Sequence, residues 1–129
     1  MSTPAETVQE FVAAFIAAWP EGDTTTLGSF FSEDAVYHNM PMEPVEGRSA
    51  IQTALAEFMS MGGQAGVDII HLVADGAIVM TERVDYFVGT EQTISMPVMG
   101  VFEVHGGVIT AWRDYFDLAQ VTSQMPGEG

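Results

Sequence analysis

Three ionisable side chains at strand-like spacing give this chain its clearest chemical signal. Arg83 and Asp85 stand two residues apart in a run rich in β-branched residues, and Asp114 stands in a later run of the same kind. Alternate residues of a strand point to one face, so Arg83 and Asp85 are predicted to share a face with the apolar Val79 and Phe87. A charge among apolar neighbours is costly unless it is paired. One guanidinium can hold two carboxylates through its planar fork, which predicts an acid–arginine–acid cluster.

Two carboxyl groups joined in this way need not share one protonation state. If one stays ionised against the guanidinium and the other stays protonated, the site holds a general base and a general acid together. A competing interpretation is an ordinary solvent-facing ion pair, which is the commoner arrangement for an Arg and an Asp two residues apart on a strand. The position of Asp114 next to Arg113 does not decide between them, because adjacent strand residues point to opposite faces.

A short strand over residues 35–39 adds two polar groups. Tyr37 and Asn39 share a face of this strand, so the phenol and the amide point the same way. By themselves they also fit a hydrogen-bonding pair beside a turn. Arg48, at the start of a predicted helix, fits an ion pair with Glu46 or with an aspartate nearby.

Composition narrows the class of ligand. The chain has 129 residues, of which 47% are hydrophobic and 16% charged, as expected for one globular domain. Eighteen acidic residues against three arginines give a net charge of -15, which disfavours nucleic acid, membrane surfaces and anionic substrates and favours a neutral small molecule. Without cysteine there is no disulfide or thiol nucleophile, and His38, His71 and His105 are not spaced as metal ligands. No metal site is predicted. No signal peptide or membrane span is recognisable, so a cytoplasmic location is expected.

The order of elements predicts an α+β fold. Thr3, Pro4 and Glu6 fit the start of a helix that runs to Trp19, and further helices are expected over residues 23–31 and 48–61. Strands are expected over 67–73, 77–88, 93–104 and 108–116, separated by turns at 75–76, 89–90 and 106–107. Three helices would then pack on one face of a bent, four-stranded antiparallel meander. Both faces of the 77–88 run are largely apolar, which predicts burial on both sides. The whole of 1–129 is expected to be one domain, with a loose tail over 123–129.

Five segments in order along the chain resemble one enzyme family. They are Glu33 to Pro41, Glu46 to Arg48, Glu82 to Asp85, Pro97 to Glu103 and Trp112 to Asp117, with Tyr-x-Asn, Arg-x-Asp and Trp-Arg-Asp-Tyr-Phe-Asp as the most specific pieces. Together they resemble the limonene-1,2-epoxide hydrolase family of the NTF2-like (SnoaL-like) superfamily. The resemblance implies an NTF2-like cone, with three N-terminal helices packed on a curved, mixed, mostly antiparallel sheet. It also implies a homodimer, no metal or organic cofactor, and one-step opening of an epoxide by water.

Residue roles follow from the same resemblance. Asp85 would be the general acid that protonates the epoxide oxygen, Asp114 the base that takes a proton from water, and Arg83 the bridge between them. Tyr37 and Asn39 would hold the water with Asp114. The substrate would be a neutral terpene-like or cycloalkene epoxide in an apolar pocket lined by Leu27, Phe30, Leu55, Phe58, Met59, Val79, Phe87, Met96, Val98, Trp112 and Phe116. Two other functions stay open: a proton-shuttling isomerase or cyclase, and a non-catalytic pocket that binds a small molecule.

Overall fold

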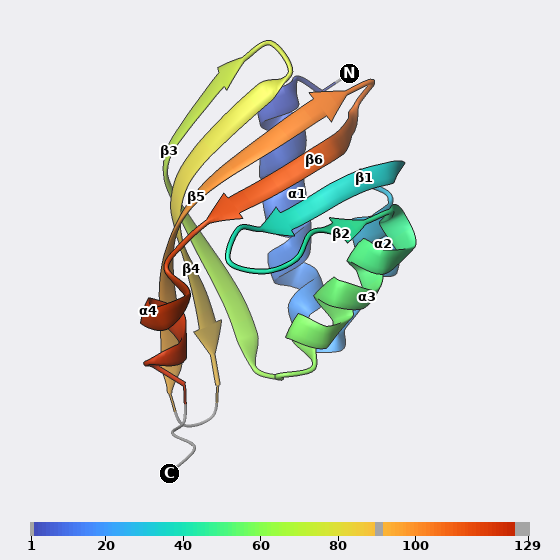
Figure 1. Ribbon diagram of the computed structural model, residues 1–129. Helices are drawn as coiled ribbons and strands as arrows, with labels where there is room; N and C mark the ends of the chain where they lie inside the picture. Colours follow the sequence, from blue (N-terminus) through green and yellow to red (C-terminus); the bar gives the residue numbers. More distant parts are fainter. Residues whose placement is uncertain (1, 90–91, 126–129) are drawn as a thin grey trace.

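A computed structural model describes residues 2–89 and 92–125 as helices packed on a curved sheet (Figure 1). The α-helices are α1 (Pro4–Ala18), α2 (Thr25–Gly28), α3 (Arg48–Met59) and α4 (Leu118–Thr122), and a 3-10 turn, η1 (Trp19–Glu21), follows α1. The strands are β1 (Phe31–Asn39), β2 (Val45–Glu46), β3 (Gln64–Asp75), β4 (Ile78–Val88), β5 (Thr93–His105) and β6 (Val108–Tyr115). The described part of the chain therefore has four α-helices where the sequence predicted three.

Helix α1 begins as its sequence predicts. The Glu6 amide donates to Thr3 Oγ1 at 3.1 Å, and the Thr3 amide donates to Glu6 Oε1 at 2.9 Å, so both halves of the capping box are formed. The 3-10 turn η1, which contains Pro20, continues the helical segment to Glu21, and Gly22 with φ of 65° ends it. The helix lies across the concave face of the sheet (Figure 1).

The predicted second helix is wrong in its extent. The helix covers only Thr25–Gly28, and Phe31 already belongs to β1. Pairing with β6 begins at this point, where the Ile109 amide donates to the Phe30 carbonyl at 2.7 Å. Arg48 makes a different contact from the predicted ion pair, because its Nε and Nη2 donate to the Phe31 carbonyl at 3.1 and 2.9 Å. This contact fixes the start of α3 to β1.

The sheet is mixed, with the strand order β2-β1-β6-β5-β4-β3. Strands β1 and β6 are parallel, and the other neighbouring pairs are antiparallel. Register shifts in β3 and at Glu103/Val104 in β5 interrupt the ladders, and such bulges bend a sheet. Strand β2 lies between β1 and α3 along the chain, and the predicted turn at 89–90 lies partly outside the described residues.

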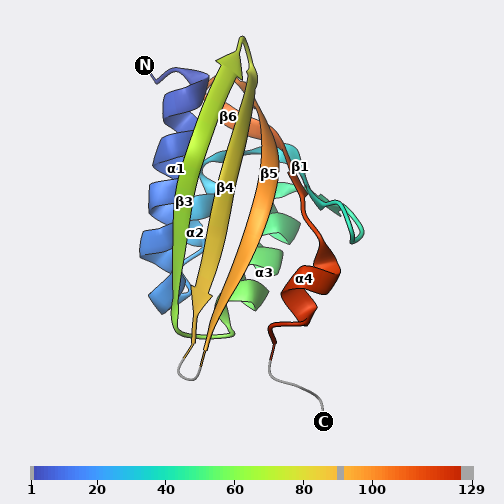
Figure 2. The ribbon, with the colours of Figure 1, turned by 90° about the vertical axis from the view of Figure 1, so that its left-hand side faces the viewer.

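The helices leave one face of the sheet open. In Figure 2 the strands β3, β4 and β5 lie in front, with α1 and α3 behind them. The prediction that β4 is buried on both faces is therefore wrong, since Met80 and Glu82 on its outer face are exposed. On the inner face, Phe11 of α1 packs edge-on against Phe31 and Trp112 and anchors the core. Among the described helices, none is long and apolar enough to cross a membrane.

Candidate active site

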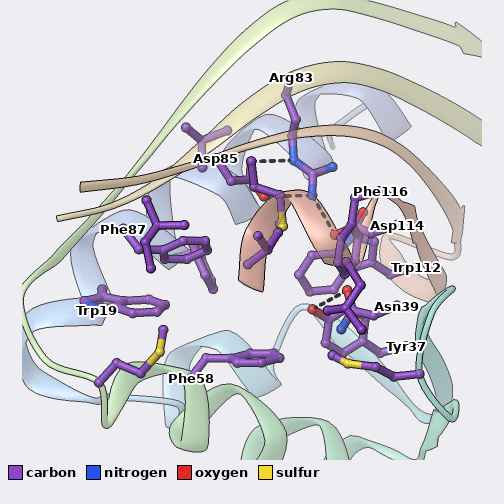
Figure 3. A pocket seen from close by; sticks show the side chains of 18 of the residues that line it. Trp19, Tyr37, Asn39, Phe58, Arg83, Asp85, Phe87, Trp112, Asp114 and Phe116 are labelled. Atoms are coloured by element: carbon purple, nitrogen blue, oxygen red, sulfur yellow. Dashed lines mark hydrogen bonds and ion pairs between the residues drawn. The ribbon is translucent and has the colours of Figure 1, made fainter. Parts of the chain in front are cut away.

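Strand register brings the polar residues of three strands together on the concave face. In the parallel pair β1–β6, Tyr37 lies beside Trp112 and Asn39 beside Asp114. Arg83 and Asp85 share the inner face of β4, which lies two strands away from β6. The five polar residues and Trp112 therefore face one cavity, as the close-up of the pocket shows (Figure 3).

Arg83 bridges the two carboxylates with three short hydrogen bonds. Its Nε donates to Asp85 Oδ1 at 2.8 Å, and its Nη2 donates both to Asp85 Oδ2 at 3.1 Å and to Asp114 Oδ2 at 2.6 Å. Only 3% of Arg83, 9% of Asp85 and 2% of Asp114 is exposed. The solvent-facing ion pair that the sequence left open is excluded by this burial.

The cluster shifts the pKa of both Arg83 and Asp114. Burial lowers the pKa of Arg83, but attraction to Asp114 and Asp85 outweighs burial, so the net pKa is raised and the guanidinium stays charged. Burial raises the pKa of the Asp114 carboxyl above its usual range, although Arg83 and the Trp112 hydrogen bond oppose this. Asp114 is therefore a better proton acceptor than an ordinary surface aspartate would be.

Trp112 and Tyr37 complete the surroundings of Asp114. The Trp112 indole N–H donates to Asp114 Oδ1 at 2.7 Å, so each carboxylate oxygen of Asp114 has one donor. The Tyr37 ring stacks on Trp112 with 4.0 Å between ring centroids, and its hydroxyl donates to Asn39 Oδ1 at 3.3 Å. Burial raises the pKa of the Tyr37 phenol, with Asp114 adding to the effect, so Tyr37 remains a neutral hydrogen-bonding group.

The cavity beside these residues has a volume of about 240 Å³. Phe58, Phe87, Met96, Trp112 and Phe116 line it, as the sequence predicted. The remaining six predicted lining residues do not line it: Leu27, Phe30, Leu55, Met59, Val79 and Val98. Leu27, Leu55 and Val79 are completely buried in the core instead, and Val98, opposite Arg83 in the β4–β5 ladder, is also buried.

Most of the remaining wall comes from elements that the sequence assigned to the core or left unassigned. Helix α1 and η1 contribute one group of these residues, and α4 together with Met125 closes another side. The lining residues that sequence reasoning missed are Phe11, Val12, Phe15, Trp19, Met42, Met61, Val67, Ile94, Phe102, Leu118, Val121, Thr122 and Met125. Strand pairing gives a signal for Val67, which is opposite Asp85 in the β3–β4 ladder. Over the residues that the structure describes, no group of His, Cys, Asp or Glu is arranged to hold a metal ion.

A side-chain amide fixes α4 against the sheet. Beyond the end of β6, Gln124 Nε2 donates to the Ser95 carbonyl at 2.7 Å and Gln124 Oε1 accepts from the Ser95 amide at 3.0 Å. The amide thus replaces a neighbouring strand at this edge of β5. Of the tail predicted to be loose, residues 126–129 lie outside the described part of the chain.

The structure is therefore a small α+β domain that holds a buried Asp–Arg–Asp cluster on the concave face of its sheet, and comparison with known proteins gives the family. A family model described as the limonene-1,2-epoxide hydrolase catalytic domain matches residues 4–127. The chain belongs to the limonene-1,2-epoxide hydrolase family and is an epoxide hydrolase.

Individual relatives agree with this assignment. The chain is 38% identical to the epoxide hydrolase EphG of Mycobacterium tuberculosis over 109 residues, which are 83% of this chain and 71% of that protein. It is similar to the solved structure of an LEH-like epoxide hydrolase from M. tuberculosis, with 36% identity, a TM-score of 0.70, and coverage of 89% and 86% of the two chains. An NTF2-like protein from Anabaena variabilis shares the fold, with a TM-score of 0.76 at 15% identity and coverage of 91% and 94%. The expected NTF2-like α+β fold with a mixed sheet is therefore confirmed.

Proposed function

We propose that this enzyme hydrolyses a neutral, apolar epoxide to a vicinal diol in one step, with Asp85 as the acid and Asp114 as the base. The observation that supports this proposal best is that both carboxylates share Arg83 Nη2, at 3.1 and 2.6 Å, inside a largely apolar cavity. With a buried cation between them, one carboxyl group can be ionised and the other protonated. The free-energy cost of burying the two groups is then lower than it would be for two isolated carboxyl groups.

The reaction that these residues can perform balances without a further reactant. Water attacks one epoxide carbon, the bond from that carbon to the epoxide oxygen breaks, and the oxygen takes the proton of Asp85. At the same time Asp114 removes a proton from the attacking water. Concerted transfer avoids both an alkoxide and a free hydroxide, and each transfer of this kind contributes typically ~10²–10⁴-fold to the rate. A proton must then return from Asp114 to Asp85 before the next turnover.

The substrate class rests on the cavity and on the charge of the chain. The walls away from the cluster are aromatic and aliphatic, including Phe15, Trp19 and Phe58. The volume of about 240 Å³ is just below the usual range of about 300–1,000 Å³ for ligand sites and favours a compact ligand. A net charge of -15 disfavours anions. A terpene-like or cycloalkene epoxide meets all three conditions.

The direct test is a panel of cyclic epoxides with detection of the diols. We expect turnover by the native enzyme, and a loss of at least ~10²-fold in Asp85→Asn and in Asp114→Asn, with the fold retained. Asp75→Asn, a change in an exposed β3 residue, is the control and should leave the rate unchanged. Retained activity in either variant of the cluster would refute the assigned roles.

Isotope labelling separates direct attack from a covalent intermediate. In a single turnover in ¹⁸O-water, direct attack puts the label into the diol. If an aspartate were the nucleophile, the first turnover would put unlabelled enzyme oxygen into the diol instead. Proton transfer at carbon, as in an isomerase, would give no diol at all.

We also propose that the enzyme is a homodimer that pairs through the open face of the sheet. The outer face carries exposed apolar side chains from four neighbouring strands, among them Ile70, Met80, Met99 and Tyr115. Arg113 on this face lies 2.7 Å from Glu103 and offsets its charge, which reduces the repulsion between two copies of this acidic chain. We expect a dimer in sedimentation velocity and a monomer for Met80→Glu; a native monomer would refute this arrangement.

A further inference from the structure

Arg83 reaches Asp114 by crossing an intervening strand. The order of strands is β4-β5-β6, and neighbouring strands lie about 4.8 Å apart, so the two residues start from strands separated by roughly 10 Å. The β5 residue below the crossing is Gly100, which is paired with Thr81 on one side and with Asp114 on the other. The row Thr81–Gly100–Asp114 therefore lies directly under the guanidinium.

A side chain at position 100 would occupy the place of the guanidinium. A Cβ built on Gly100 would lie 2.1 Å from Arg83 Nη1, 2.7 Å from Asp114 Oδ1 and 3.0 Å from Thr81 Oγ1. The first of these distances is far below any normal contact. Gly100 does not have a positive φ, so the backbone itself does not require glycine here. Space for Arg83 is the physical reason for glycine at this position.

Thr81 fixes the remaining arm of the guanidinium. Its hydroxyl donates to the Gly100 carbonyl at 3.3 Å and accepts from Arg83 Nη1 at 3.1 Å. Thr81 is completely buried, so water does not replace this acceptor. With Nη1 held by Thr81, the other two nitrogens, Nε and Nη2, are directed at Asp85 and Asp114.

We propose that Gly100 and Thr81 are positioning residues, which act through Arg83 to place the two catalytic carboxylates. The proposal rests on the proposed function for its effect on turnover, but the placement itself can be tested without substrate. Neither residue needs to touch the epoxide. Their action is to keep the guanidinium flat across β5, where it can bridge both acids.

The Trp112 indole gives a readout of this placement. Its N–H donates to Asp114 at 2.7 Å, so the indole NMR signal should follow the protonation of Asp114. The chain has two tryptophans, and the Trp19 indole donates to the Gly62 carbonyl at 3.0 Å, which makes it an internal reference. Arg83 opposes the rise in pKa that burial and Asp85 cause at Asp114. When the guanidinium moves away, the midpoint of the Trp112 titration should therefore move to higher pH.

The test compares Gly100→Ala with Gly66→Ala. Gly66 is also a strand glycine without a positive φ, but an added Cβ there would meet only the Tyr86 side chain, at an ordinary 3.7 Å. We expect Gly100→Ala to move the Trp112 midpoint upward and to lower kcat by ~10²-fold, with a smaller change in KM. Gly66→Ala should change none of these. The same midpoint and kcat in both variants would overturn the proposal.

A second pair of variants keeps the test decisive if Gly100→Ala does not fold. Thr81→Val removes the hydroxyl at nearly constant shape, and Thr81→Ser keeps it. We expect the valine variant to show the upward midpoint shift and reduced kcat, and the serine variant to behave like the native enzyme. Equal behaviour of the two variants would refute the role of the hydroxyl. If the variants show these titration shifts but the native enzyme hydrolyses no epoxide, the proposed function alone is refuted.

Discussion

Replacing Arg83 with lysine tests whether the shape of the guanidinium, rather than its charge, holds the cluster together. Arg83 makes three hydrogen bonds to carboxylates from two different nitrogens, and a fourth to Thr81 from the third nitrogen. A lysine ammonium keeps the positive charge but has a single nitrogen at the end of a flexible stem. It cannot occupy the Nε and Nη2 positions together, so at least one carboxylate loses its donor.

The size of the effect follows from the number of bonds lost. A hydrogen bond to a charged group contributes about 1.5–3 kcal/mol, so losing two of the three carboxylate bonds costs about 3–6 kcal/mol before any rearrangement. Because the lysine ammonium recovers part of the free energy of the lost hydrogen bonds, we expect Arg83→Lys to lower the free energy of unfolding by about 3 kcal/mol. A domain of this size is typically stable by about 5–15 kcal/mol, so the variant should still fold. We expect kcat/KM to fall by at least ~10²-fold, because one of the two proton transfers is misplaced.

Urea denaturation, followed by circular dichroism at constant m-value, measures the loss of stability. Arg113→Lys is the matched control: Arg113 Nη1 lies 2.7 Å from Glu103 Oε2, but the two side chains are 30% and 31% exposed. The same substitution should cost about 0.5 kcal/mol or less there and leave the rate unchanged. If Arg83→Lys matched this control in stability and rate, the argument from the planar fork would be refuted.

Three further predictions concern Asp114, Trp112 and Gln124. Because burial raises the pKa of Asp114 above the ordinary 3.8, kcat/KM should fall on the acid side at a pH above that value. Protonated Asp114 then favours the folded state, so the stability that it contributes is present at low pH and is lost as the pH rises through the pKa of the folded state. The melting temperature of the native enzyme relative to that of Asp114→Asn should therefore drop over this pH range. A difference in melting temperature that stays constant with pH would contradict the shift in pKa. Trp112→Phe keeps a ring to stack on Tyr37 but removes the donor to Asp114, and should cost about 1.5–3 kcal/mol in urea denaturation; less than 0.5 kcal/mol would contradict it. Gln124→Ala removes both contacts to Ser95, and amide exchange in α4 should become faster while β4 is unchanged; equal protection would show that Gln124 does not hold α4.

The polar part of the site could be predicted because strands have a fixed period. Alternation places Arg83 and Asp85 on one face whatever the surrounding structure, and the same rule joins Tyr37 to Asn39. The sequence could not give which residue of β5 lies between Arg83 and Asp114, because this depends on the register of the strands. For that reason the importance of Gly100, which lies between them, became visible only with the register in hand.

The apolar part of the site was predicted much less well. A helical stripe shows which face of a helix is buried, but not whether that face meets the core or a cavity. Leu27 and Leu55 pack into the core, whereas Phe15 and Trp19 of the first helical segment line the pocket. Helix α4 has only five residues, too few for a recognisable helical period, so the wall that it forms left no signal in the sequence.

The surroundings of the two carboxylates decide which aspartate is the proposed base. Asp114 has Asn39 as its neighbour across the β1–β6 ladder, and the Tyr37 hydroxyl is bonded to Asn39, so polar groups that can hold water lie on its side of the cluster (Figure 3). Asp85 lies opposite Met96 and Val67 in its two ladders, and both of those residues line the cavity. Water bound beside Asp85 would meet apolar side chains there instead of a second polar group, at a cost in free energy. In the proposed reaction the epoxide lies the opposite way round, with its oxygen at Asp85 and its hydrocarbon skeleton against the apolar wall. If Asp85 were the base instead, water would have to bind against the apolar wall and the hydrocarbon skeleton of the epoxide against the polar groups beside Asp114.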